Sequence, residues 1–335
     1  MAPLTRCRAS EGRVPNELMA EYYRQRASAG LIISEATAVD PTGVGYPNTP
    51  GIWSDAQVEG WKKVTQAVHD AGGRILLQLW HVGRISDPEY LDGAPPVAPS
   101  ALPAPGNVSL LRPERPHPVP RALDIEEIPG IVEAYRRGAE NAKRAGFDGV
   151  ELHGANGYLL DQFLHSLSNH RTDVYGGSIE NRARLLLEVV DAAISVWGPD
   201  RVGVHLSPRC DILGMGGDDR VETFRYVAEA LGAKKIAFIM TRESIGEDSL
   251  SPVLKELFGG PYIANEELTA DSATGLIADG KAEAVSFGKL YISNPDLVER
   301  LEAGVSLADP NPETFYGSGL GPVGYVDYPA MECVK

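Results

Sequence analysis

The sequence predicts one α/β domain, residues 1–335, with the architecture of a (β/α)₈ barrel. Three observations lead to this prediction. Short apolar segments alternate with helical patterns along the chain, and eight such segments are found. Open doubly wound sheets usually carry fewer strands. No G-x-G-x-x-G motif follows the first segment, as a dinucleotide-binding sheet would require.

The expected strands are the apolar segments, in chain order Met1–Thr5, Leu31–Glu35, Arg74–Trp80, Gly149–His153, Arg201–Ser207, Lys235–Met240, Pro261–Ala264 and Ala284–Phe287. The expected helices fill most of the gaps and follow the last strand: Asn16–Ala29, Asp55–Ala71, Glu126–Ala145, Ile179–Trp197, Val221–Leu231, Leu250–Phe258, Thr269–Ala278 and Asp296–Ala303. The proline-rich residues 94–120 are too long for a simple connection. We expect a functional loop at the barrel mouth there, with a flexible excursion of no role as the alternative.

Composition excludes several classes of function. A net charge of −15 lacks the basic footprint of a nucleic-acid-binding protein. No apolar run approaches the roughly 20 residues of a membrane span. Cys7, Cys210 and Cys333 lie far apart and match neither a disulfide framework nor a metal-binding spacing, which favours a reduced, cytoplasmic compartment. The first residues lack the apolar core of a signal peptide.

The carboxyl ends of barrel strands meet at one face, where this fold places its chemistry. The residues at the expected strand ends are Thr5, Ala36, Gln78 with Trp80, His153, His205, Arg242, Asn265, and Gly288 with Lys289. The loops after strands seven and eight of such barrels often bind a phosphate. Asn265, Gly288 and Lys289 suit that role, because a glycine lets the backbone approach closely and a lysine supplies a cation.

The segment His153-Gly-Ala-Asn156-Gly-Tyr158 closes an apolar strand with three polar side chains. His153 and Asn156 could both donate to one carbonyl oxygen, and Tyr158 could supply a proton beside it. The structural alternative is a capped strand end with a satisfied histidine, which is common for so short a pattern.

Taken together, the chain resembles the Old Yellow Enzyme family of FMN-dependent ene-reductases over essentially its whole length. The segments that carry the resemblance are Met1–Arg6, Ser34–Ala36, Gln78–Trp80, His153–Leu159, Asn169–Ser178, Glu180–Arg182 and Asn294–Leu297. The resemblance implies that NADPH or NADH reduces a non-covalently bound FMN and leaves. An enone or a nitro compound with an activated C=C bond then enters the same pocket and is reduced.

The resemblance also implies roles for individual residues. The implied catalytic residues are Tyr158 as proton donor and His153 with Asn156 as donors to the substrate oxygen. The implied cofactor-binding residues are Pro3, Thr5, Ala36, Gln78, His205, Asn265, Gly288 and Lys289. The implied substrate-binding residues are Tyr46, Trp80, His153 and Asn156. We expect a monomer or homodimer that contains no metal, since His81, His165 and His170 are scattered.

Three departures from the family pattern leave an alternative open. His205 and Lys289 stand where many relatives have arginines, and a histidine is only partly charged near neutral pH. The chain also begins within the first barrel strand of its relatives, so that strand is expected to be truncated. The alternative is therefore a truncated homologue that is non-catalytic or poor in flavin. A Schiff-base aldolase would need a lysine within a strand, and none is present.

Overall fold

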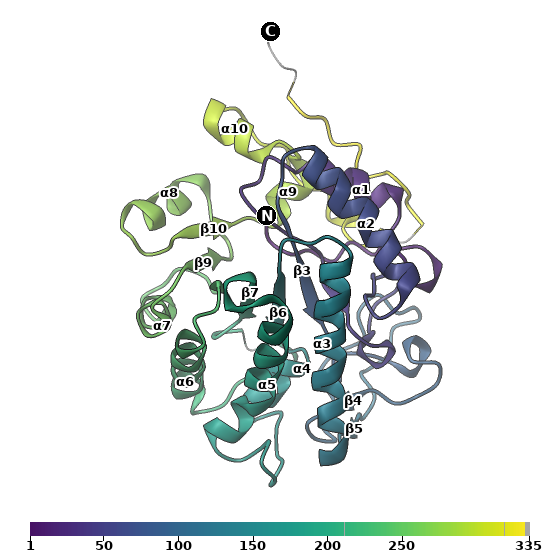
Figure 1. Cartoon of the computed structure of the whole chain (residues 1–335), viewed down its shortest axis with the longest axis vertical. Helices are drawn as coiled ribbons and strands as arrows, with labels where there is room; N and C mark the ends of the chain where they lie inside the picture. The colour runs from purple at the N-terminus through teal and green to yellow at the C-terminus, as the bar shows by residue number, and fades with distance from the viewer. Residues whose placement is uncertain (211, 318, 332–335) are drawn as a thin grey trace.

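The computed structural model describes residues 1–210, 212–317 and 319–331, and these form a curled parallel sheet ringed by helices (Figure 1). The successive strands of the sheet are β1 (Ile32–Ile33), β3 (Ile75–Trp80), β6 (Val150–Gly154), β7 (Val202–Leu206), β8 (Phe238–Arg242), β9 (Tyr262–Asn265) and β10 (Ala284–Ser286). All neighbours pair in parallel, and spatial order equals chain order. This confirms the predicted α/β barrel class.

The second expected strand, Leu31–Glu35, is wrong in its extent. It is present as β1 and a separate two-residue strand, β2 (Thr37–Ala38), and both pair with β3. The ladder is interrupted because the main-chain N–H of Gln78 donates to the Ser34 hydroxyl, 3.2 Å away, and not to a main-chain carbonyl. The sixth strand also differs, since it begins at Phe238 and ends at Arg242.

Residues 1–5 do not form the expected strand, yet their first two residues join β10 to β1. The Ala2 N–H donates to the Phe287 carbonyl at 2.9 Å, and the Ile33 N–H donates to the Met1 carbonyl at 3.1 Å. Pro3 has no N–H with which to continue such a ladder. The pairing therefore stops after Ala2, and the chain from Pro3 onward runs along the face at the strand ends.

Helices cover the outside of the sheet (Figure 1). They are α1 (Glu17–Arg24), α2 (Asp55–Asp70), α3 (Ile128–Arg144), α4 (Leu159–Leu164), α5 (Ile179–Trp197), α6 (Arg220–Ala233), α7 (Ser251–Phe258), α8 (Ala270–Ala278), α9 (Lys289–Ser293) and α10 (Leu297–Ala303). α1 ends earlier than expected because the Arg26 N–H bonds to the Tyr23 carbonyl, three residues back, in a tighter turn. α9 was not expected, since Lys289 was assigned to a loop. No helix of the described ranges is long and apolar enough to cross a membrane.

The barrel interior beneath the strand ends is filled by apolar side chains. This buried cluster consists of Ile33, Leu76, Phe238, Met240 and Ile263. Gly203 on β7 lies against it, and a Cβ atom at that position would stand 2.2 Å from the Phe238 ring. The barrel interior is thus a packed core, and the cavity described below lies at the carboxyl ends of its strands.

The C-terminal segment packs over the N-terminal residues. Tyr22 of α1 and Tyr325 stack with ring centroids 4.1 Å apart and an interplanar angle of 3°. The Arg6 guanidinium lies 5.0 Å from the Tyr325 ring centroid and donates to the Gly324 carbonyl at 2.7 Å. These contacts hold the segment that carries Tyr316 beside the residues that follow Met1.

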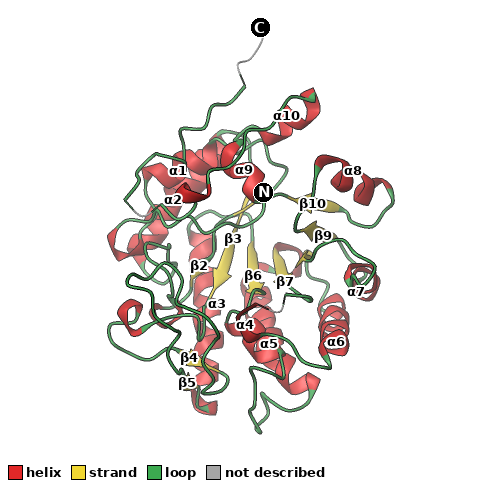
Figure 2. Ribbon diagram, turned by 180° about the vertical axis from the view of Figure 1, so that it is seen from behind, coloured by secondary structure: helices red, strands yellow, loops and turns green. Residues whose placement is uncertain are grey.

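The proline-rich residues 94–120 contain β4 (Val97–Ala98), which pairs with β5 (Arg121–Ala122) away from the main sheet (Figure 2). The Arg84 guanidinium, which follows β3, donates to the Leu102 carbonyl at 3.0 Å. Within this stretch Ser109 lines the cavity described below.

Candidate active site

One cavity of ≈ 960 Å³ opens at the carboxyl ends of the strands, and all thirteen residues predicted for the site line it. They come from the N-terminal segment (Pro3, Thr5), the turn between β1 and β2 (Ala36), the loop after β2 (Tyr46), β3 (Gln78, Trp80), β6 and its turn (His153, Asn156, Tyr158), β7 (His205), β9 (Asn265) and the start of α9 (Gly288, Lys289). The volume lies within the range of ordinary cofactor pockets.

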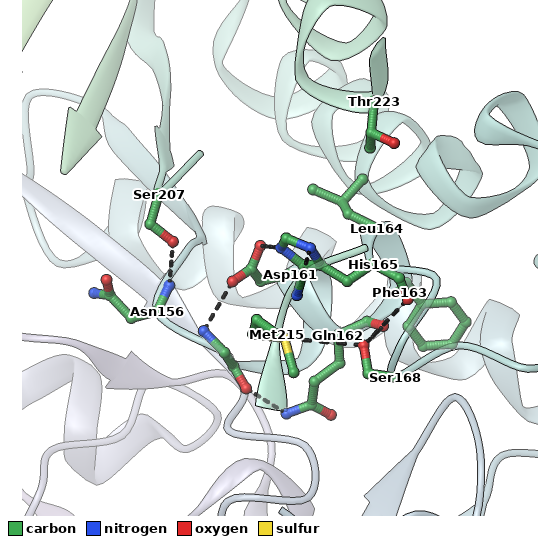
Figure 3. A network of polar contacts seen from close by, with 12 residues as sticks. Asn156, Asp161, Gln162, Phe163, Leu164, His165, Ser168, Ser207, Met215 and Thr223 are labelled. Atoms are coloured by element: carbon green, nitrogen blue, oxygen red, sulfur yellow. Dashed lines mark hydrogen bonds and ion pairs between the residues drawn. The ribbon is translucent and has the colours of Figure 1, made fainter. Parts of the chain in front are cut away.

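The turn after β6 is clamped by hydrogen bonds (Figure 3). Asn156 has a φ of +58°, a left-handed conformation that asparagine tolerates better than most residues. Its main-chain N–H donates to the Ser207 hydroxyl at 2.7 Å. The Gly157 N–H donates to Asp161 at 2.8 Å, and the Gly157 carbonyl accepts from Gln162 at 2.7 Å. The backbone around Asn156 therefore has little freedom.

Behind this turn, the buried His165 ring links two loops. Its Nε2 lies 3.0 Å from an Asp161 carboxylate oxygen, and its Nδ1 accepts from the Gly216 N–H at 3.1 Å (Figure 3). The same Asp161 carboxylate binds the turn through Gly157. The loop after β7, whose Leu213 lines the cavity, is thereby connected to the turn that carries Asn156.

Aromatic rings form one wall of the cavity. The Tyr158 and Tyr46 hydroxyl oxygens are 2.8 Å apart, and the Trp80 ring stands edge-on to Tyr158 with centroids 5.0 Å apart. Burial raises the pKa of Tyr158 well above its ordinary value. Its phenol is therefore protonated at neutral pH and can act as an acid.

The His153 and His205 rings stack with centroids 5.3 Å apart. Burial lowers the pKa of His205 to about 3, with a smaller contribution from the Arg242 cation. Burial, and then His205 and Arg242, lower the pKa of His153 as well. Both imidazoles are therefore neutral near pH 7. The expectation that His205 is partly charged there is wrong, because an imidazolium would be desolvated beside a guanidinium.

Beneath the histidines lies a buried carboxyl group. Gln78 on β3 donates from Nε2 to Glu151 of β6 at 2.7 Å, and the same atom lies 3.4 Å from the His205 ring. Burial raises the pKa of Glu151 to about 8. The Gln78 amide nitrogen is thus held by Glu151, so its carbonyl oxygen is the end left to accept a hydrogen bond from a ligand.

The opposite end of the cavity is formed by the ends of β9 and β10. The Asn265 side-chain amide donates to the Ser286 carbonyl at 2.9 Å, and the Asn265 main-chain carbonyl accepts from the Glu243 N–H at 3.0 Å. Gly288 precedes α9, and the exposed Lys289 supplies a cation. Two glutamates follow Asn265 in conformations with positive φ, +103° for Glu266 and +52° for Glu267.

Sequence reasoning missed several residues of the cavity. Ser109, Leu213, Glu266 and Tyr316 all line it. The long proline-rich loop was a signal for Ser109. No signal in the sequence pointed to Tyr316, because it reaches the cavity from the C-terminal segment, which is held in place by the stacking of Tyr325 on Tyr22. Arg242 was identified as a strand end but was given no role.

The polar groups that line the cavity suit FMN. His205 Nε2 and His153 Nδ1 are buried and have no hydrogen-bond partner among the described residues. Such atoms are costly unless a ligand satisfies them. A cation at one end, neutral polar groups at the other and apolar walls between suit a phosphate joined to a flat heterocycle. The residues present therefore fit FMN. No cluster of three metal-ligating side chains exists within the described residues.

Comparison with known proteins identifies the class. A profile of the NADH:flavin oxidoreductase / NADH oxidase family matches residues 1–308. A Leishmania infantum protein named "Probable flavin mononucleotide-dependent alkene reductase" is 43% identical over 343 residues, covering 99% of this chain and 93% of that protein. The Old Yellow Enzyme homologue from Zymomonas mobilis superposes with a TM-score of 0.95 at 46% identity, covering 99% of this chain and 95% of that one.

Morphinone reductase in complex with tetrahydroNAD superposes equally well, with a TM-score of 0.95 at 49% identity over 99% of this chain and 93% of that one. The chain belongs to the NADH:flavin oxidoreductase / NADH oxidase family, and within it to the Old Yellow Enzyme-like oxidoreductases. It is an FMN-dependent enzyme of the ene-reductase class with a nicotinamide nucleotide as reductant.

Proposed function

We propose that this enzyme reduces the activated C=C bond of α,β-unsaturated carbonyl or nitro compounds, with NADH or NADPH as the reductant. The observation that carries the proposal is the convergence of three groups on one cavity. His153 and Asn156 are uncharged hydrogen-bond donors, and Tyr158 is a phenol that stays protonated. These are the groups needed to polarise an unsaturated carbonyl and to protonate the carbon next to it.

In this proposal His153 and Asn156 donate to the carbonyl or nitro oxygen of the substrate. Electron density moves toward that oxygen, and the β-carbon becomes electrophilic. FMN, when bound, would supply the hydride that this carbon accepts. Because His153 is neutral, it stabilises the developing charge as a hydrogen-bond donor and is not itself the proton source.

Tyr158 delivers the proton to the α-carbon. Its hydroxyl is 2.8 Å from that of Tyr46, so Tyr46 can donate to the Tyr158 oxygen once the proton has left. Trp80 holds the ring edge-on and, with Tyr46, shapes the substrate pocket. The raised pKa of Tyr158 favours return of the proton between turnovers.

The remaining cavity residues are proposed to hold the cofactor. Pro3, Thr5 and Ala36 line the cavity and would contact the ring system of bound FMN, and Gln78 and His205 would hold its pyrimidine edge. In this proposal Thr5 would hydrogen-bond the flavin O4. Asn265, Gly288 and Lys289, which also line the cavity, would hold the phosphate, with Lys289 as the cation.

The test is Tyr158→Phe, followed in separate half-reactions by anaerobic stopped-flow absorbance. Flavin reduction by NADH should be nearly unchanged, whereas turnover of 2-cyclohexenone should slow by about 10²–10⁴, the value of general acid catalysis. The rate of reduction of a nitroalkene should fall less, because hydride addition to it leaves a stabilised nitronate that does not need immediate protonation. Tyr226→Phe on α6, outside the cavity, is the matched control.

Equal loss of NADH oxidation and enone reduction in Tyr158→Phe would mean that Tyr158 only maintains the site, and its role as an acid would be withdrawn. Wild-type protein that keeps no flavin absorbance after loading with FMN and desalting would favour the alternative of a flavin-poor homologue.

A further inference from the structure

Arg242 at the end of β8 joins two residues of the cavity wall. Its guanidinium donates to the Glu266 carboxylate from Nε at 2.7 Å and from Nη2 at 3.2 Å. Its Nη1 donates to the Asn156 side-chain oxygen, Oδ1, at 3.2 Å. All three residues line the cavity, and Arg242 is half-buried. A chain of contacts therefore runs from β9 through β8 to the turn after β6.

This contact determines which end of the Asn156 amide faces a ligand. The oxygen and nitrogen of an amide are nearly equal in shape, so an asparagine without neighbours can present either. A guanidinium has donors only, and it can therefore face only the oxygen. Since the Asn156 backbone is held by Ser207, rotation of the amide is the main freedom left.

We propose that Arg242 is a positioning residue that holds Asn156 with its NH₂ group toward the substrate oxygen, and that Glu266 holds Arg242 in place. The proposal rests on the function proposed above, in which Asn156 donates to the substrate. The same contact withdraws electron density from the amide, which makes its N–H a stronger donor.

Two features of Glu266 agree with this role. Its φ of +103° is a conformation that residues with a side chain rarely adopt, so a glutamate is kept there at a conformational cost. Its carboxylate receives two hydrogen bonds from Arg242, a forked geometry that orients the guanidinium as well as balancing its charge. Arg242 can therefore orient the amide while little net charge is added to the cavity.

The experiment compares Arg242→Gln with Arg242→Lys in FMN-loaded protein. Glutamine carries both a donor and an acceptor and cannot select one amide orientation, whereas lysine carries donors only. The limiting rate of flavin reoxidation by 2-cyclohexenone should fall roughly 3- to 30-fold in Arg242→Gln, part of the 10²–10³ lost with a whole donor. Arg242→Lys should recover most of the rate. The FMN dissociation constant should change less than about twofold in both.

A double-mutant cycle separates orientation from general disturbance of the site. In an Asn156→Ala background, Arg242→Gln should slow reoxidation by less than about twofold, because there is no amide left to orient. The same slowing with and without Asn156 would overturn the proposal while leaving the proposed function intact. If Asn156→Ala alone did not slow reoxidation, both the proposed function of Asn156 and this inference would be wrong.

Glu266→Gln provides a second route should Arg242→Gln lose FMN. It retains Arg242 but weakens its anchor, so a smaller slowing, roughly two- to fivefold, is expected with the same dependence on Asn156. An unchanged rate in Glu266→Gln would contradict the role given to Glu266.

Discussion

Replacement of Glu151 by glutamine should remove a pH-dependent loss of stability. Glu151 is fully buried on β6, where it accepts a hydrogen bond from Gln78. Its other oxygen has no partner among the described residues. Burial raises the pKa of this carboxyl to about 8 from an ordinary value of 4.5. Glutamine has a similar shape, retains an acceptor for Gln78 and carries no charge.

The sign and size of the effect follow from proton linkage. Above pH 4.5 the unfolded chain releases the Glu151 proton, whereas the folded protein keeps it until about pH 8. The free energy of unfolding therefore falls as the pH rises through this window, by ~1.4 kcal/mol per pH unit. The whole window corresponds to ~5 kcal/mol, and above pH 8 the difference between the two proteins is constant.

Urea unfolding of the FMN-saturated proteins at pH 5 and pH 8.5 measures this difference. The difference in unfolding free energy, Glu151→Gln minus wild type, should be ~4 kcal/mol larger at pH 8.5 than at pH 5. Glu229→Gln, at an exposed position on α6, should show no such gain. Parallel pH profiles for wild type and Glu151→Gln would refute the argument that Glu151 is protonated in the folded protein.

Three further predictions follow from individual contacts. Lys289→Ala should weaken FMN binding roughly 10- to 100-fold by equilibrium fluorescence, whereas Lys281→Ala should not; equal affinities would exclude Lys289 from the phosphate site. Because burial lowers the pKa of His205 to about 3, wild type takes up a proton on unfolding between pH 6.5 and 3. His205→Gln should thus lower the acid-unfolding midpoint, and an unchanged midpoint would contradict this. Tyr325→Leu loses the stack on Tyr22 and should cost roughly 2–4 kcal/mol in urea unfolding; an unshifted midpoint would count against it.

The sequence by itself determined the barrel class and most of its strands. Alternation of short apolar segments with helical patterns is local information, and it identified β3, β6, β7, β9 and β10 to within one residue at either end. It also determined which side chains meet, because the carboxyl ends of successive parallel strands must lie at one face of the barrel. The residues predicted at the strand ends, such as Gln78, His153 and His205, line one cavity for that reason, whereas Pro3 and Tyr46 were implied by the family resemblance alone.

Only the tertiary structure decided the protonation state of those residues and which other residues contact them. The neutrality of His205 depends on burial and on Arg242, and neither is visible in a linear pattern. Likewise, Tyr316 reaches the cavity only because the C-terminal segment packs on α1. The link from Arg242 to Asn156 joins residues 86 apart in the chain. The charge state and the hydrogen-bond partners of a side chain depend on neighbours that come from distant parts of the sequence. Whether a segment forms a strand or a helix depends mainly on its own residues.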